Sequence, residues 1–164
     1  MIENVKFKKA SEKEKFLYCC LGEALCAVQI LEDALSHSIV LKKTEPSQKE
    51  EADNLLKKQR FYTFGKAINV AKKEDLLPES LMFELGEFLP ERNWLIHESL
   101  IENKNEFQSD SFYKKLSERT NGISLKAHKL QIKIELELIK YTEKKGIDLS
   151  EVKNKMNKHY DINL

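Results

Sequence analysis

The apolar residues between positions 17 and 35 recur at alternating intervals of four and three, and this spacing constrains the fold more than any other feature. They are Leu17, Leu21, Ala24, Val28, Leu31 and Leu35. The spacing places one apolar stripe along an α-helix, and it is typical of helices that pack nearly antiparallel. Ser11 precedes the stripe and, with Glu14 three positions later, forms a capping box. The sequence therefore predicts a long amphipathic helix over residues 11–41.

Prolines, caps and apolar spacing predict further helices along the chain. Ser47 and Glu50 form a second capping box after the break at Pro46. Asp110 or Ser111 is expected to cap the longest later helix. The further predicted helices cover residues 47–61, 66–73, 78–101, 110–145 and 148–159. We therefore expect a single all-α domain over residues 1–164, with a polar arm at 1–10 and a tail at 160–164. Its architecture should be a bundle of four to five helices in which the first and the last but one are long.

Composition supports a helical bundle and narrows the function classes. Charged residues make up 34% of the chain and apolar residues 41%, with only 5 glycines and 3 prolines, so at least two thirds of the chain should be helical. The formal net charge of +1 argues against a large surface that tracks nucleic acid, but it leaves room for a small local RNA site.

The cysteines and the hydropathy pattern predict a cytoplasmic protein. Three cysteines without a CxxC pair indicate no disulfide framework, and we expect Cys19, Cys20 and Cys26 to be small core residues. The lysine-rich start has no apolar run of signal-peptide length. No apolar run of about 20 residues stands out as a membrane span. We therefore expect no membrane association, and the sequence gives no sign of a cofactor or a metal site.

Arg92 is the residue whose position calls for an explanation. In a continuous helix over residues 81–101, Arg92 lies within the arc of an apolar stripe formed by Leu81, Leu85, Phe88 and Ile96. A guanidinium group there is costly unless it is paired or functional. Asn93 and His97 are one helical turn apart and share a face. An arginine and a histidine without a carboxylate cluster suit phosphodiester cleavage without a metal.

Two other interpretations of the same residues stay open. Pro90 loses a backbone hydrogen bond, so the helix must kink or restart there. A restart would place Arg92 and Asn93 in a first turn whose free N–H groups favour an anion. Alternatively, Arg92 is structural and pairs with a carboxylate of the first helix, for example Glu23 or Glu32.

The segment Arg92-Asn93-Trp94-Leu95-Ile96-His97 resembles the R-x4–6-H motif of the HEPN superfamily, in the form where a polar residue follows the arginine. Leu21-Gly-Glu, Gln29-Ile-Leu-Glu32 and Thr63-Phe-Gly65 also resemble parts of bacterial HEPN-like proteins, whereas Pro90 departs from the uninterrupted helix of the family. The resemblance implies a helical bundle that dimerises, so that two motifs meet in a cleft. Active members are metal-independent endoribonucleases, often toxins of toxin–antitoxin or phage-defence systems, and inactive members are dimerisation or binding modules.

By this resemblance, Arg92 would hold the phosphate of RNA, Asn93 would orient it and His97 would act as general acid and base. The expected partners are RNA, a second copy of the chain, and an antitoxin or other partner protein. A second apolar set on the same helix, Phe83, Trp94 and Ile101, is expected to be covered by that second copy. Two alternatives are a catalytically silent HEPN-like module and a plain helical adaptor. In the enzyme, Arg92 and His97 of two chains should face an open cleft, whereas in the adaptor Arg92 should be buried against a carboxylate.

Overall fold

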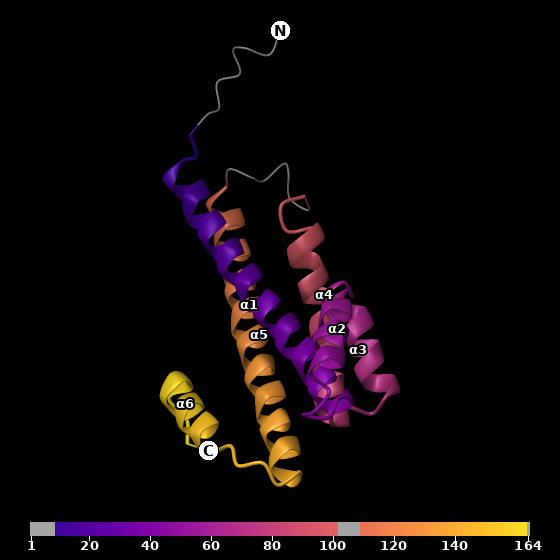
Figure 1. The fold of residues 1–164 in the computed structure, drawn as a ribbon. Coiled ribbons are helices and arrows are strands. Elements are labelled where there is room, and N and C mark those ends of the chain that lie inside the picture. Colours follow the sequence, from indigo (N-terminus) through magenta and orange to yellow (C-terminus); the bar gives the residue numbers. More distant parts are fainter. Residues whose placement is uncertain (1–8, 102–108, 164) are drawn as a thin grey trace.

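The computed structural model describes residues 9–101 and 109–163, and 80% of these residues are helical, with no strand among them. This confirms the all-α fold class. The described part holds six helices, where the predicted bundle had four to five, and the last of them stands apart from the others (Figure 1). They are α1 (Glu12–Lys43), α2 (Lys49–Arg60), α3 (Phe64–Lys73), α4 (Glu79–His97), α5 (Asp110–Lys144) and α6 (Ser150–Tyr160).

The two long helices, α1 and α5, lie side by side at the centre of the molecule (Figure 1). They run parallel, because Lys13 pairs with Asp110 at their starts and Lys145 pairs with Glu45 just beyond their ends. The expectation of a nearly antiparallel partner is wrong for this pair. The physical reason is the connection, since α4 carries the chain back to the start of α1 before α5 begins. The antiparallel neighbour of α5 is α4, whose Glu84 and Glu91 pair with Lys133 and Arg119 in reverse order.

The core forms where the apolar stripe of α1 meets α5. Five of the six stripe residues are buried, and Leu21 is half-buried against them. On α5 the facing side chains are Leu116, Ile123, Ala127, Leu130 and Ile134. The periodicity of the sequence therefore placed the buried face of α1 correctly.

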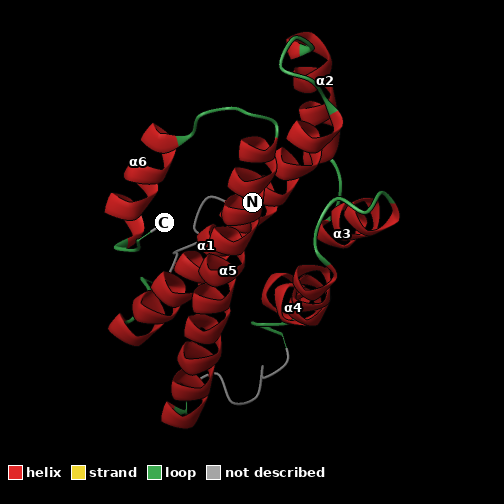
Figure 2. Cartoon of the chain, turned by 90° about the horizontal axis from the view of Figure 1, so that it is seen from below, coloured by secondary structure: helices red, strands yellow, loops and turns green. Residues whose placement is uncertain are grey.

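Helices α2, α3 and α4 flank the second half of α1 (Figures 1 and 2). Thr63 caps α3, because its side chain accepts a hydrogen bond from the backbone N–H of Lys66. Phe64 of α3 packs edge-on against Phe88 of α4, with ring centroids 6.2 Å apart. A Cβ atom at Gly65 would lie 3.4 Å from the end of the Leu89 side chain, so the packing of α3 against α4 does not require glycine at this position.

Several predicted helix ends differ from those observed. The Ser11–Glu14 capping box is present, but α2 begins after Gln48 and Ser47 provides no cap. The cap of α5 is Ser109, whose hydroxyl accepts from the N–H of Phe112, rather than Asp110 or Ser111. The polar arm at 1–10 and the connection between the predicted helices at 78–101 and 110–145 fall largely outside the described residues. These errors arise because several polar side chains in a row are all competent caps, and only the tertiary arrangement selects one.

Helix α4 runs without a break through Pro90 and ends at His97 rather than near residue 101. The restart considered for Pro90 is therefore absent, and with it the proposed first-turn anion site. After His97 the backbone N–H groups of Glu98 and Ser99 both bond to the carbonyl oxygen of Trp94, which closes the helix.

The exposed side of α1 also differs from expectation. Only Cys20 is buried, whereas Cys19 and Cys26 are exposed because they lie on the face turned away from α5. By length and composition alone, α1 is apolar enough to cross a membrane. Half of its most apolar window is buried in the bundle, and a core helix of this kind has the same composition.

Candidate functional site

Arg92 lies against α1 and is held by one carboxylate. Its Nε donates a hydrogen bond to Oε1 of Glu32 over 2.7 Å. Their side chains are 17% and 27% exposed, so water screens this ion pair only in part. Of the two carboxylates that the sequence offered, Glu32 is thus the partner of Arg92.

Asn93 and His97 lie on the open side of the same helix. The Nη1 group of Arg92 lies 3.4 Å from Oδ1 of Asn93, a long hydrogen bond that ties these two side chains together. His97 is the last residue of α4 and is exposed. It follows Arg92 by five positions, or about 140° around the helix, and no hydrogen bond joins the two within the described residues. One chain therefore brings Arg92 and Asn93 together but leaves His97 apart from Arg92.

A second arginine, which the sequence gave no reason to single out, lies beside the motif. Arg119 of α5 makes two hydrogen bonds to the carboxylate of Glu91, of 2.9 and 3.1 Å. Its guanidinium also stacks 3.7 Å from the ring centre of Trp94, a favourable cation–π contact. Glu91 is next to Arg92 in sequence, but its partner lies on another helix, and no local pattern encodes that pairing.

Trp94 is buried inside the chain, with 6% of its surface exposed, so its expected place on an exposed apolar set is wrong. The reason is its contact with Arg119, which holds the indole against α5. Phe83 and Ile101 are 68% and 60% exposed, so both side chains are accessible to a second copy of the chain. Phe83, Asn93 and His97 are all exposed on α4, so one side of this helix has no covering element among the described residues.

The arrangement offers a fixed cation rather than a metal centre. The described residues contain no group of three or more His, Cys, Asp or Glu side chains that could hold a metal ion. Within the same part of the chain, Nη2 of Arg92 has no hydrogen-bond acceptor. A guanidinium that is anchored through Nε can donate from Nη2 to a phosphate oxygen with little loss of side-chain entropy.

A third polar cluster lies further along α1. Arg60 of α2 donates through Nε and Nη2 to Oδ1 of Asp33, and Nδ1 of His37 lies 3.2 Å from Oδ2 of the same carboxylate. These side chains are about half exposed, so the cluster is a surface ion-pair network. The Arg60–Asp33 pair is therefore more exposed to solvent than the Arg92–Glu32 pair, although both carboxylates belong to α1.

Comparisons of the chain with protein-family models, with curated proteins and with solved structures gave no match. The likeness to HEPN proteins therefore rests on the residues quoted above and remains a prediction.

Proposed function

We propose that this chain is a metal-independent endoribonuclease of HEPN type that acts as a homodimer, in a toxin–antitoxin or phage-defence setting. The observation that carries the proposal is the state of Arg92. It shares one unbroken helix with Asn93 and His97, its Nε is anchored by Glu32, and its Nη2 has no acceptor within the described residues. That geometry suits a group that must meet charge developing on a phosphate.

The proposed reaction uses the 2′-hydroxyl of RNA as the nucleophile. This oxygen attacks the adjacent phosphorus, the bond to the 5′ oxygen breaks, and the product is a 2′,3′-cyclic phosphate. His97 takes the proton from the 2′-hydroxyl or returns one to the leaving oxygen, and Arg92 stabilises the charge on the phosphoryl oxygens. Because Arg92 and His97 diverge around one helix, a second copy of α4 is part of the proposal: it brings His97 of one chain toward Arg92 of the other.

A second candidate, a helical module without catalytic activity, either HEPN-like or a plain adaptor, is favoured by one specific observation. Arg92 is only 17% exposed and paired with a carboxylate, the arrangement expected of a structural arginine. In this case the uncovered side of α4 would serve for dimerisation or for binding a partner protein such as an antitoxin. DNA or RNA would then not be cleaved, and Arg92 would contribute to stability alone.

RNA cleavage by the purified protein in the presence of EDTA tests the enzymatic proposal. His97→Ala should lower the rate by roughly 10²–10⁴, the usual worth of general acid–base catalysis. His128→Ala is the matched control, because His128 is also exposed but lies on α5, outside the motif. Products should carry 2′,3′-cyclic or 3′ phosphate, and DNA should be spared because it lacks the nucleophile. Equal cleavage by the wild type and His97→Ala would contradict the enzyme and leave the silent module.

The dimer is tested by sedimentation at tens of micromolar, a rough working range for interfaces of standard size. Phe83→Lys should convert the dimer to a monomer, because it places a charge on the uncovered face of α4. Leu125→Lys, at a comparably exposed site on α5, should leave the mass unchanged. A wild-type monomer at these concentrations would remove the dimer from the proposal.

A further inference from the structure

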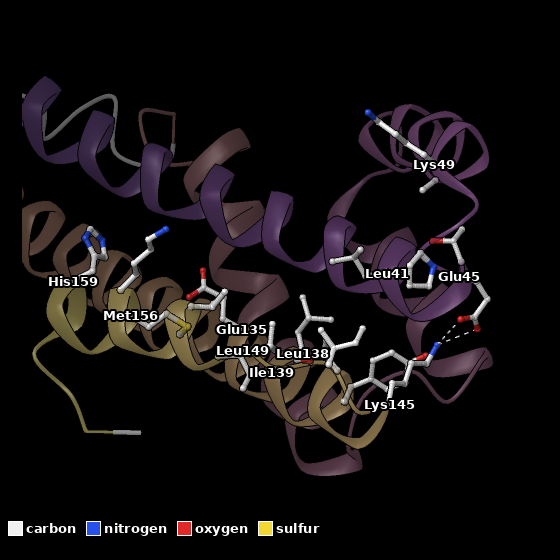
Figure 3. Close-up of a pocket in the computed structure, with 18 of the residues that line it drawn as sticks. Leu41, Glu45, Lys49, Glu135, Leu138, Ile139, Lys145, Leu149, Met156 and His159 are labelled. Atoms are coloured by element: carbon white, nitrogen blue, oxygen red, sulfur yellow. Dashed lines mark hydrogen bonds and ion pairs between the residues drawn. The ribbon is translucent and has the colours of Figure 1, made fainter.

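Helix α6 lies apart from the bundle and leaves an apolar groove beside it. None of its residues is buried, and Figures 1 and 2 show it set off from α5. The groove has a volume of about 800 Å³ and lies among α5, α6, the end of α1 and the start of α2. Its walls are mainly aliphatic, with Leu41, Leu138 and Ile139 on the bundle side and Leu149, Val152 and Met156 on the α6 side (Figure 3). Open apolar surface of this kind is unfavourable unless something covers it.

Both ends of α6 are joined to α5. At one end a short link that contains Gly146 (φ +80°) joins α6 to α5. At the other end, the hydroxyl of Tyr160 donates to Oε2 of Glu135 over 3.0 Å and accepts from Nε2 of Gln131 over 2.9 Å. Burial and the Glu135 carboxylate raise the pKa of Tyr160 to about 12, so the Tyr160 hydroxyl stays protonated and keeps its hydrogen bond to Glu135 at neutral pH. Helix α6 is therefore joined to α5 at both ends, by the chain itself and by the Tyr160 hydroxyl.

The volume of the groove suits a small molecule. A volume of about 800 Å³ lies within the usual range for small-molecule sites, which are mostly apolar with a few polar groups.

The charges at the two ends of the groove indicate which head group the molecule carries. At one end of the groove Lys145 pairs with Glu45, and its Nζ lies 3.1 and 3.3 Å from the two carboxylate oxygens (Figure 3). The Glu45 side chain is 64% exposed, so it can turn into solvent and release the ammonium group. Glu135, Lys155 and His159 line the side of α6 away from Lys145. Lys155 pairs with Glu151, and the Glu135 carboxylate disfavours an anion there. The ligand that matches these walls and charges is a molecule with an aliphatic chain and an anionic group at the Lys145 end.

We propose that the groove between α5 and α6 binds one long-chain carboxylate, with its aliphatic chain along Leu138, Leu149 and Met156 and its carboxylate at Lys145. Because these residues lie outside the motif on α4, the proposal stands apart from the ribonuclease activity.

Binding of cis-parinaric acid to the full chain, followed by its fluorescence and by competition with sodium oleate below the micelle threshold, tests the proposal. The wild type should bind one molecule saturably. Met156→Lys should weaken binding at least about tenfold, because it places a charge among the aliphatic walls. Asn154→Lys is the matched control: it adds the same charge to the outer side of α6 and should bind like the wild type. Because α6 has no buried residue, neither variant should impair folding of the bundle.

The head group is tested separately. Lys145→Gln should weaken oleate roughly two- to fivefold, the range of a partly exposed ion pair, and should leave oleyl alcohol unchanged. Lys144→Gln, one position earlier and outside the groove, should alter neither ligand. The proposal is overturned by an absence of saturable binding in the wild type or by equal binding in Met156→Lys and Asn154→Lys. It is also overturned if Met156→Lys changes the sedimenting mass, which would show that a second copy occupies the groove.

Discussion

Replacing Arg92 with alanine tests the central contact of the candidate site. The ion pair with Glu32 has a short 2.7 Å hydrogen bond and side chains that are 17% and 27% exposed. Fully exposed pairs contribute about 0–1 kcal/mol, whereas breaking a buried pair costs about 3–5 kcal/mol. The Arg92–Glu32 pair lies between these limits, so Arg92→Ala should lower the free energy of unfolding by about 2 kcal/mol. For a chain of 164 residues this corresponds to a fall in Tm of about 4–8 °C.

Urea unfolding of the wild type, Arg92→Ala, Glu32→Gln and the double variant measures this cost and isolates the pair. The double-mutant cycle should give a coupling free energy of about 1–2 kcal/mol. Arg60→Ala is the control, because Arg60 pairs with Asp33 on the same helix while both side chains are about half exposed, and it should cost less than about 1 kcal/mol. If Arg92→Ala costs no more than Arg60→Ala, Glu32 does not hold Arg92 in solution, and Arg92 is not anchored in advance for a phosphate.

Four further substitutions have defined outcomes in the same unfolding assay. Trp94→Ala should cost about 3–5 kcal/mol, because it empties a buried site and removes the surface on which Arg119 stacks. Gly122→Ala should stabilise the protein by up to about 1 kcal/mol, because a Cβ there meets no atom within 4 Å, whereas Gly146→Ala should destabilise it by about 1 kcal/mol because φ is +80°. Tyr160 has a native pKa of about 12, above its ordinary value of 10.0, so its contribution to stability is complete below about pH 10 and is lost as the pH rises to about 12. Unfolding of the wild type and Tyr160→Phe on either side of that window should show the loss in the wild type alone.

The secondary structure could be predicted because its causes are local. The four-and-three spacing of α1 and the Ser11–Glu14 capping box each act within a few residues, and both were found where the sequence placed them. The direction of α5 relative to α1 has no such local cause. Periodicity defines which face of a helix is apolar but not which way its neighbour runs, so the parallel pairing became visible only from contacts such as Lys145 with Glu45.

The candidate site divides in the same way. The sequence identified Arg92 as a charge on an apolar stripe and named Glu32 as one of two carboxylates that could meet it. It gave no way to choose between them, because the choice depends on the offset of α4 along α1, which packing of the whole bundle sets. Arg119 was missed for a similar reason, since its partners Glu91 and Trp94 belong to a different helix. Trp94 was misplaced because a single large aromatic does not reveal which side of α4 finds a neighbour.

The motif on α4 and the groove beside α6 should act as independent units, because they share no side chain. Glu32 anchors the motif and does not line the groove, and neither do Arg92, Asn93 and His97. Substitutions at sites without shared partners usually add. His97→Ala should therefore leave the affinity for cis-parinaric acid unchanged, and Met156→Lys should leave RNA cleavage unchanged. A ligand that altered cleavage would show that α1 or α5 has a second arrangement to which both sites respond, because a coupling free energy needs a physical element that both sites bias.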